Sequence, residues 1–393
     1  MNSIFDENMA GDLKCRTCML LITHACNLHC SYCYESHKDK KTMSFSLAKS
    51  IILQEAEHVK KEASFERLEI DFMGGEPLMN FPLIQEIVEW LEKEPLDVPF
   101  ICFATTNGTL LDDSMKNWFR KHKNSIWLGA SYDGSPKAQQ KNRGEKAADV
   151  DYGFFYELWP RQGFKMTISK DSLPDLAEGI LETQRKGYRL AASLAQGVDW
   201  TEDDAEIYLE QLRKLSQIYR SEDTLTPINL LTKELRITQN HEKKQKRFCG
   251  TGTYMATYDV DGKCYGCQMF SPLVLGDERA IESQQMNWGD EDIADDVRCR
   301  QCCLKDYCPT CMGYNYFYRG DAARRDFRWC KMILAEIIAA CEFQILSLGQ
   351  QKNLSGLEAE YGMAALKASS ILQVLSIKEA EPPFKGGEEY GNP

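Results

Sequence analysis

Short apolar segments alternate with helical patterns throughout the first 220 residues of the chain. Six segments have the composition of strands, and each is followed by apolar residues at helical spacing. These segments are residues 19–23, 68–77, 100–108, 126–134, 165–169 and 189–195. Consecutive strand–helix units predict parallel strands joined by right-handed crossovers. A closed eight-unit barrel needs about 250 residues, so we expect an α/β fold in which residues 19–220 form a partial (β/α)6 barrel of the TIM type.

Polar or glycine-rich turns follow the first four of these segments. They are a cysteine loop at residues 24–35, a Gly-Gly-Glu-Pro turn at 74–77, Asn107-Gly108, and residues 131–134. In barrels of parallel strands the chemistry collects at the carboxyl ends of the strands. Four such turns at the same end of successive strands therefore predict a functional site there.

The 16 cysteines of the 393-residue chain bear on its cellular compartment. The first 14 residues carry acids and lack the apolar core of a signal peptide. We therefore expect a cytoplasmic protein whose clustered cysteines bind metal rather than form disulfides. The net charge of −12 argues against a nucleic-acid partner. We also see no apolar run of about 18 residues, which argues against a membrane partner.

Three cysteines stand close together directly after the first predicted strand. Cys26, Cys30 and Cys33 have the spacing C-x3-C-x2-C. An iron–sulfur cubane takes one cysteine per iron, so three cysteines leave one iron for a substrate or cofactor. A structural zinc site is the alternative, and it needs a fourth ligand. The candidates for that ligand are His24, His29 and His37.

This cysteine loop, with an aromatic residue before its last cysteine, resembles the signature of the radical S-adenosylmethionine enzymes. The resemblance implies a [4Fe–4S] cluster on the three cysteines, whose fourth iron binds S-adenosylmethionine and whose electron cleaves it to a 5'-deoxyadenosyl radical. It also implies cofactor-binding residues in the turns, with glycines that permit close backbone approach and an acid that suits an ammonium group. These residues are Tyr32 near the adenine, Gly74, Gly75, Glu76 and Pro77 at the methionyl amine, and Asn107 and Ser131 in further contacts. Taken singly, each turn is also an ordinary turn sequence.

A second group of cysteines dominates residues 249–330. Their spacing is C-x12-G-x4-C, then C-x2-C-x5-C-x2-C, then a last cysteine, and it is similar to that of the SPASM domain of radical enzymes that act on peptides and proteins. The similarity implies two auxiliary [4Fe–4S] clusters, and so three clusters in all. The implied ligands of the first are Cys249, Cys267, Cys311 and, as the fourth, Cys264. Those of the second are Cys299, Cys302, Cys308 and Cys330. The spacing before Cys311 is x2 where the family has x3, so Cys303 is an alternative ligand.

The remaining divisions of the chain follow from composition. We expect an N-terminal extension over residues 1–18, a connector over 221–248, a SPASM domain over 249–346, and a C-terminal helix with a disordered tail over 347–393. Cys15 and Cys18 are expected to be reduced thiols on the extension. Cys102 and Cys341 are expected to be small buried residues. Two zinc ribbons remain an alternative for the C-terminal cysteines.

The resemblance further implies a radical oxidoreductase that abstracts a hydrogen atom from a peptide or protein and takes electrons from an external donor of the flavodoxin or ferredoxin type. We expect a peptide maturase that installs a thioether, carbon–carbon or carbon–oxygen crosslink in a ribosomally made precursor. The alternative is an anaerobic sulfatase-type maturase that oxidises Cys or Ser to formylglycine. In that class an aspartate base follows the cysteine of G-x4-C, whereas this chain has Gln268, and an amide cannot accept that proton at neutral pH. A non-catalytic zinc or electron-transfer protein is the remaining alternative.

Overall fold

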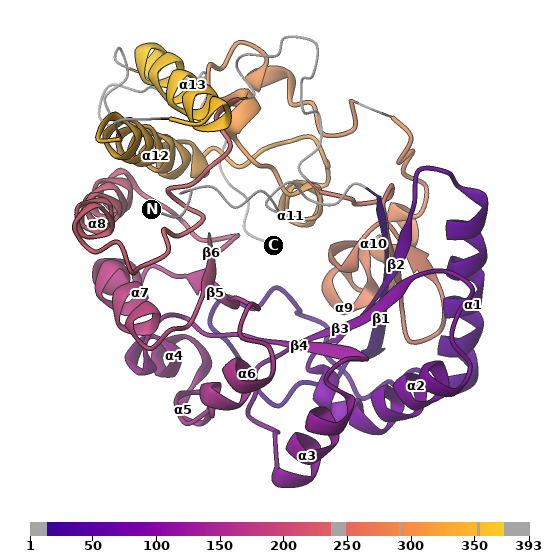
Figure 1. Ribbon diagram of the computed structural model, residues 1–393. Coiled ribbons are helices and arrows are strands. Elements are labelled where there is room, and N and C mark those ends of the chain that lie inside the picture. The colour runs from indigo at the N-terminus through magenta and orange to yellow at the C-terminus, as the bar shows by residue number, and fades with distance from the viewer. Residues whose placement is uncertain (1–13, 237–248, 291, 352–353, 373–393) are drawn as a thin grey trace.

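The strands of the N-terminal half run in the same direction around a partial barrel (Figure 1). This computed structural model describes residues 14–236, 249–290, 292–351 and 354–372. The first six strands are β1 (Cys15–Thr23), β2 (Arg67–Gly74), β3 (Phe100–Thr106), β4 (Ile126–Ala130), β5 (Phe164–Ile168) and β6 (Leu190–Leu194). Strands β1 to β4 are neighbours in one parallel sheet, and β5 and β6 form a parallel pair. A parallel bridge between Ser131 and Lys165 joins the two groups. The predicted partial (β/α)6 barrel is therefore confirmed.

Helices cover the outer side of these strands (Figure 1). They are α1 (Phe45–Lys61), α2 (Phe81–Lys93), α3 (Asp113–His122), α4 (Pro136–Arg143), α5 (Glu145–Ala148), α6 (Tyr152–Leu158), α7 (Leu176–Arg185) and α8 (Glu202–Ser221). Helix α2 shows why they pack this way: its apolar residues recur at three- and four-residue spacing and form a buried side that includes Ile84, Ile87 and Leu91. Helix α8 begins with a capping box between Thr201 and Asp204.

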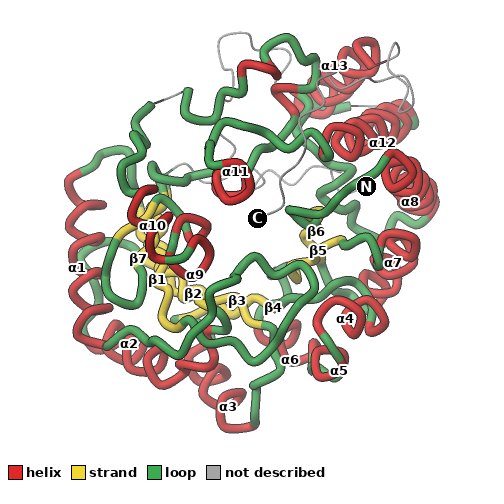
Figure 2. Tube along the Cα trace, turned by 180° about the vertical axis from the view of Figure 1, so that it is seen from behind, coloured by secondary structure: helices red, strands yellow, loops and turns green. Residues whose placement is uncertain are grey.

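The C-terminal region completes the barrel's sheet. Its elements are β7 (Met255–Tyr258), β8 (Cys264–Tyr265), α9 (Pro272–Leu275), α10 (Asp277–Ser283), α11 (Met312–Arg319), α12 (Trp329–Gly349) and α13 (Gly356–Leu372). Strand β7 pairs in parallel with the free edge of β1, and β8 pairs antiparallel to β7. Figure 2 shows this region lying between α8 and α1, where the ring of helices is open. The cysteine-rich region is thus hydrogen-bonded to the barrel, a relationship that its spacing pattern did not predict.

Helix α12 is long and apolar enough to cross a membrane, contrary to the expectation that the chain has no such run. In the structure 67% of its 18-residue apolar window is buried inside the protein. It packs against α8 and α13, and the hydroxyl of Tyr208 on α8 donates a hydrogen bond of 2.6 Å to Glu336 on α12. The apolar surface of α12 is therefore part of the protein core.

One expectation about the ends of the chain was wrong. Strand β1 begins at Cys15, so Cys15 and Cys18 are buried strand residues and not thiols on an extension. Helix α13 lies within residues 347–393, for which we expected a helix and a disordered tail. Residues 1–13, 237–248 and 373–393, which include most of the expected extension and parts of the connector and tail, lie outside the described residues. Cys102 and Cys341 are buried, as expected.

Candidate functional site

The cysteine loop begins where β1 ends, at the carboxyl end of the parallel strands. Within it, the amide of Cys33 donates a hydrogen bond of 3.1 Å to the carbonyl of Cys30. Burial raises the pKa of Cys30 to about 11; the guanidinium of Arg143 opposes the rise, and the sulfurs of Cys33 and Cys26 add to it. The three predicted cluster ligands are therefore electrostatic neighbours in the folded chain.

Lys38 lies on the same loop and contacts one of these cysteines. Its ammonium donates a hydrogen bond of 3.0 Å to the sulfur of Cys33 and lies 3.8 Å from a carboxylate oxygen of Glu35. Burial raises the pKa of Glu35 to about 7, against the opposing effect of Lys38. We assigned neither residue a role from the sequence, because a lysine five residues after a cysteine belongs to no spacing pattern. The contact becomes visible only in the folded loop.

The Gly-Gly-Glu-Pro turn packs directly on the start of the cysteine loop. The amide of Gly75 donates to the carbonyl of Thr23 (3.0 Å), and the amide of Glu76 donates to that of Ala25 (2.8 Å). A Cβ at Gly74, where φ is +144°, would lie 2.0 Å from the oxygen of Thr23, and one at Gly75 would lie 2.4 Å from that of Ala25. Only glycine fits such an approach. The two glycines therefore fix the beginning of the loop against the end of β2.

The carboxylate of Glu76 is buried and connects the end of β2 with the end of β3. It accepts hydrogen bonds from the amide of Leu78 (3.0 Å), the hydroxyl of Thr106 (2.7 Å) and the amide of Asn107 (2.8 Å). Burial raises the pKa of Glu76, and these three bonds oppose the rise. Pro77 begins a short 3-10 helix, Pro77–Asn80. A carboxylate offers about four acceptor positions, so an amine would be a further donor to a side chain that the fold already holds in place.

The other predicted cofactor contacts lie at the ends of the next two strands. The side chain of Asn107 donates a hydrogen bond of 3.0 Å to Asn27 in the cysteine loop and accepts one of 2.9 Å from the amide of Thr109. Ser131 is buried directly after β4, where its amide donates to the carbonyl of Thr106 (2.9 Å). The structure thus brings the predicted turns and the cysteine loop to one end of the barrel, while their roles toward a cofactor stay predictions.

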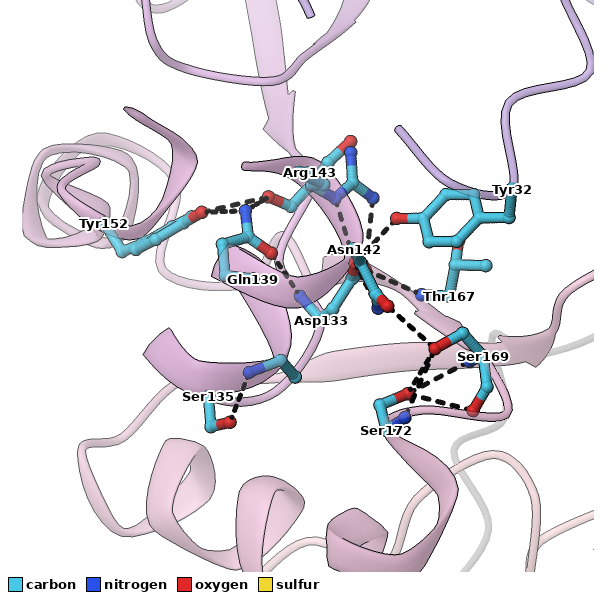
Figure 3. Close-up of polar contacts among 12 residues, drawn as sticks. Tyr32, Asp133, Ser135, Gln139, Asn142, Arg143, Tyr152, Thr167, Ser169 and Ser172 are labelled. Carbon is cyan, nitrogen blue, oxygen red and sulfur yellow. Dashed lines mark hydrogen bonds and ion pairs between the residues drawn. The ribbon is translucent and has the colours of Figure 1, made fainter. Parts of the chain in front are cut away.

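Asp133 is the centre of a buried polar network that reaches the cysteine loop (Figure 3). Its carboxylate accepts hydrogen bonds from the hydroxyl of Tyr32 (2.6 Å), the side-chain amide of Asn142 (3.0 Å) and the backbone amide of Thr167 (3.1 Å). Arg143 completes the network through an ion pair with both carboxylate oxygens, at 3.0 and 3.1 Å. The guanidinium carbon also lies 5.4 Å from the centre of the Tyr32 ring. The position of Tyr32 is therefore fixed from two sides.

Arg143 is a candidate site residue that the sequence did not reveal. It is the last residue of α4 and is buried, and its charge acts on both Cys30 and Glu76. A guanidinium held between a cysteine loop and a carboxylate is suited to an anionic group such as the carboxylate of a small molecule. No sequence signal marked it, because the stretch after residue 134 lacks a clear helical period.

The four cysteines predicted for the second auxiliary cluster come together in the C-terminal region. Burial raises the pKa of Cys330, and the sulfurs of Cys308, Cys299 and Cys302 raise it further. The amide of Cys302 donates to the carbonyl of Cys299 (3.0 Å), and Arg325 donates to the carbonyl of Cys308 (3.1 Å). These cysteines lie on the loops before α11 and at the start of α12, so residues up to 31 positions apart meet at one place.

Three of the four cysteines predicted for the first auxiliary cluster also lie together, but Cys264 is not with them. Burial raises the pKa of Cys267 to about 12, and the sulfurs of Cys311 and Cys249 add to the rise. Cys264 instead forms a hydrogen bond with Tyr258 and lies within electrostatic reach of Glu55 on α1. The role of Cys264 as the fourth ligand stays a prediction, and the neighbours given for its side chain, Glu55 and Tyr258, differ from those of Cys267.

Comparison with known families identifies one segment of the N-terminal half of the chain. Residues 20–149 match the model of the radical SAM superfamily, a stretch that contains the cysteine loop, the Gly-Gly-Glu-Pro turn and the Asp133–Arg143 pair. The chain contains a radical SAM domain. An uncharacterized protein of Methanocaldococcus jannaschii is 33% identical over 116 residues, which are 30% of this chain and 38% of the relative. The matched segments span between 24% and 38% of the curated relatives.

Solved structures resemble the fold beyond the radical SAM domain. A structure of anSMEcpe, a sulfatase maturase, with bound AdoMet has a TM-score of 0.61 at 15% identity and covers 85% of this chain and 99% of that chain. The same protein with AdoMet and the Cp18Cys peptide has a TM-score of 0.60 at 15% identity and the same coverage. SuiB of Streptococcus suis bound to S-adenosylmethionine has a TM-score of 0.51 at 14% identity and covers 80% of this chain and 77% of that chain. At these identities the likeness concerns the fold alone.

The radical SAM domain implies a [4Fe–4S] cluster, and the cysteine loop fits one. Within the described residues, no three His, Cys, Asp or Glu side chains approach closely enough to bind a single metal ion. A cubane does not require such an approach, because each cysteine ligates a different iron. Three neighbouring thiols lie at the mouth of the barrel, beside the cationic side chains of Lys38 and Arg143. This donor set suits an iron–sulfur cluster.

Proposed function

We propose that this protein is a radical S-adenosylmethionine enzyme that modifies a peptide or protein, installing a thioether, carbon–carbon or carbon–oxygen crosslink in a precursor peptide. The observation that carries the proposal is the meeting of Cys26, Cys30 and Cys33 with the Gly-Gly-Glu-Pro turn at the carboxyl ends of the strands. When bound, the cluster and S-adenosylmethionine supply a 5'-deoxyadenosyl radical that abstracts a hydrogen atom from the substrate.

The residues of the barrel mouth would hold the cofactor at fixed positions. Arg143 offers its guanidinium to the carboxylate of S-adenosylmethionine. Glu76 offers a remaining acceptor position to the amine of the same cofactor. Tyr32 would lie beside the adenine, and its ring is held in place by Asp133 and Arg143. Asn107 and Ser131 line the same mouth from β3 and β4. Their contribution is orientation and exclusion of water, because the cofactor carries the radical chemistry.

The C-terminal cysteines support a role in product formation. Cys299, Cys302, Cys308 and Cys330 would hold one auxiliary cluster, and Cys249, Cys267 and Cys311 another. Clusters of this kind exchange single electrons, and an oxidative crosslink leaves one electron to remove. A peptide substrate is supported by the likeness of the fold to a protein that was crystallised with one. We further propose a cytoplasmic location and an external donor of the flavodoxin or ferredoxin type.

Oxidation of Cys or Ser to formylglycine is the second candidate, and Gln268 argues against it. This residue follows Cys267, and its side chain forms a hydrogen bond with Tyr34. An amide takes up no proton at neutral pH, so this position supplies no base. A crosslinking reaction does not require a base at residue 268.

The test is anaerobic reconstitution followed by iron and sulfide analysis and an assay of 5'-deoxyadenosine under dithionite. We expect about twelve irons with as many sulfides, corresponding to three cubanes. Replacement of Cys26, Cys30 and Cys33 by Ala should abolish 5'-deoxyadenosine, whereas Cys341→Ala, a cysteine of α12, should preserve it. Mass spectrometry of co-expressed precursor peptides then identifies the product. Two or three zinc ions without sulfide, or cofactor cleavage by the triple variant, would refute the proposal.

A further inference from the structure

The inner face of the barrel strands is not packed as a hydrophobic core. Side chains alternate between the two faces of a strand, and the residues of β1 to β6 that face the helices belong to the main core cluster. The alternate residues, which face the barrel interior, lie outside that cluster. On β4, β5 and β6 they include exposed side chains, namely Trp127 (40% exposed), Lys165, Ala191 and Ser193. The interior therefore leaves room for a ligand, whereas side chains fill the interior of a closed barrel of this type.

One row of paired residues crosses this inner face. In the register of the parallel strands the row consists, from β1 to β4, of Met19, Asp71, Phe103 and Trp127. Two aromatic rings thus lie in the same row as one carboxylate. The row crosses β2 three residues before Gly74, where the turn of the predicted cofactor site begins. A substrate held beneath that site would therefore meet the carboxylate of Asp71.

The carboxylate of Asp71 has an oxygen that the fold does not use. Its Oδ1 is buried and has no hydrogen-bond partner among the described residues. The other acid on the inner face of β2, Glu69, differs, because it accepts a hydrogen bond from Thr17 (3.5 Å) and lies near the charge of Arg67. A buried acceptor without a partner costs stability. Such an atom on an open inner face therefore needs an explanation in terms of function.

Lys165 on β5 is the opposite charge, on the other side of the barrel interior from β2 (Figure 1). Burial and the neighbouring Glu69 raise the pKa of Asp71 to about 7, and the ammonium of Lys165 opposes the rise. Desolvation by the surrounding protein lowers the pKa of Lys165, although solvent reaches its side chain, and Asp71 opposes this effect. Arg143 lowers the pKa of Lys165 further, and Glu35 opposes it. A carboxyl group that titrates near neutral pH is suited to accept a proton.

We propose that Asp71 is the catalytic base inside the barrel, which contacts the substrate and accepts the proton lost when the crosslink forms, with Lys165 as its opposing charge. The inference rests on the proposed function and deepens it, because it names a proton acceptor where Gln268 supplies none. A hydrogen atom first leaves a substrate carbon for the 5'-deoxyadenosyl radical. A bond then forms between this carbon and a thiol, a hydroxyl or an aromatic carbon of the substrate, and that group gives its proton to Asp71. The remaining electron passes to an oxidised iron–sulfur cluster of the C-terminal region.

The first measurement is thermal unfolding of the reconstituted full-length protein without substrate. A carboxyl whose pKa is raised by folding costs stability as pH rises from its unfolded-state pKa, about 3.9, to its folded-state pKa, about 7. Asp71→Asn should therefore raise the melting temperature at pH 8 and raise it less at pH 5. Asp175→Asn, which removes an exposed ion pair, is the control and should bring no gain. A lower melting temperature of Asp71→Asn at pH 8 would overturn the inference, because the carboxylate would then have a structural partner.

The second measurement follows product formation with the purified precursor peptide identified by co-expression. Asp71→Asn should lower the yield of crosslinked peptide about 100-fold or more, while 5'-deoxyadenosine still forms. Sodium formate should restore product to Asp71→Ala, where the shortened side chain leaves space for it, but not to Asp71→Asn. Sodium chloride at equal ionic strength is the control for formate. A purely structural role of Asp71 predicts no rescue by formate.

The pH profile of product formation tests the pairing with Lys165. A base acts when deprotonated, so product formation should rise as pH increases through the pKa of Asp71. Lys165→Met removes a charge that lowers this pKa and should shift the rise to higher pH, whereas Lys165→Arg should leave it in place. Glu69→Gln removes a charge that raises the pKa and should shift the rise to lower pH. An unshifted profile in both Lys165→Met and Glu69→Gln would overturn the assignment of Asp71.

The outcomes separate this inference from the proposed function. Full product yield in Asp71→Asn would overturn the inference and leave the proposed function standing. If Asp71→Ala fails to fold, Asp71→Asn and the pH profiles decide the question. A wild type that cleaves S-adenosylmethionine but modifies no peptide would contradict the proposed function, and the melting comparison then tests Asp71 alone.

Discussion

The ammonium of Lys38 donates a hydrogen bond to the sulfur of Cys33, across 3.0 Å. Hydrogen bonds to cluster sulfurs and nearby positive charge raise the reduction potential of an iron–sulfur cluster. We therefore expect Lys38→Met to lower the midpoint potential of the radical SAM cluster and to slow formation of 5'-deoxyadenosine with a weak reductant. Redox titration followed by electron paramagnetic resonance measures the change. Lys38→Arg should keep most of the potential, and Lys40→Met, at an exposed position of the same loop, should change nothing; an unaltered potential in Lys38→Met would contradict the assignment.

Asp133 is expected to be essential for the stability of the barrel mouth. It neutralises the buried guanidinium of Arg143 and accepts hydrogen bonds from Tyr32 and Asn142. Removing one partner of a buried ion pair costs about 3–5 kcal/mol, because the other charge is left uncompensated. Asp133→Asn should lower the free energy of unfolding by about 3 kcal/mol. Urea denaturation measures this, with Asp175→Asn, at an exposed ion pair, as the control that should cost less than about 1 kcal/mol.

Glu55 makes the stability of the protein depend on pH. Burial opposes ionisation of Glu55, but hydrogen bonds from Arg16 (2.7 Å) and Tyr258 outweigh it, and its pKa lies below the usual value. A carboxyl with a lowered folded-state pKa stabilises the fold above its unfolded pKa, about 4.3, and loses this contribution as pH falls through the folded pKa. Glu55→Gln should therefore be less stable than the wild type at pH 7, by about 3 kcal/mol, and this difference should shrink below about pH 4.

Thermal unfolding of the metal-free protein at pH 7 and at pH 3.5 tests this expectation. Glu57→Gln changes an exposed carboxylate two residues away and serves as the control. A stability difference between wild type and Glu55→Gln that is equal at both pH values would show that the charge of Glu55 contributes nothing.

The turn after β2 should tolerate no side chain at Gly75. A Cβ there would lie 2.4 Å from the carbonyl oxygen of Ala25, so either the turn or the cysteine loop must move. We expect Gly75→Ala to retain fewer irons at the radical SAM site and to bind S-adenosylmethionine more weakly. Gly349→Ala is the control, since a Cβ at Gly349 meets nothing within 4 Å. Isothermal titration of S-adenosylmethionine into the two reconstituted variants compares them, and equal affinities would contradict the expectation.

The second auxiliary group should be separable from cofactor cleavage. Replacing Cys299 and Cys302 by Ala is expected to remove about four irons, which is one cubane, while 5'-deoxyadenosine formation continues. The C-terminal region should also unfold more readily, because metal binding there contributes to folding. Iron analysis and limited proteolysis check both effects. Full iron content with unchanged product yield would rule out the assignment of these cysteines.

The barrel was predictable from the sequence because its signals are local. An apolar segment followed by a glycine-rich turn, as in residues 68–77, reports a buried parallel strand and its carboxyl end without help from distant residues. The start of β1 was missed for the opposite reason. From the sequence, Arg16 looks like a residue outside a strand. The fold tolerates its charge at a buried position of β1 only because Glu55, 39 positions later, pairs with it.

The surroundings of Cys264 were hidden for a similar reason. The spacing C-x2-C places two sulfurs together when the residues lie on a turn, but Cys264 lies in a strand whose face is set by pairing with Tyr258. The position of Arg143 was equally hidden, since its partner Asp133 and its neighbour Cys30 come from other elements. Long-range pairing decides such positions, and a single sequence does not display it.

The pairing of β7 with β1 determines when the sheet can be completed during protein synthesis. Strand β1 is made well before β7, and one of its edges stays without this partner until Met255–Tyr258 leave the ribosome. An open strand edge readily pairs with other chains, and contacts between residues so far apart in sequence form slowly. The nascent barrel is therefore exposed to aggregation while the residues between β1 and β7 are made. Expression that slows synthesis or supplies chaperones should raise the yield of soluble chain more than added iron does.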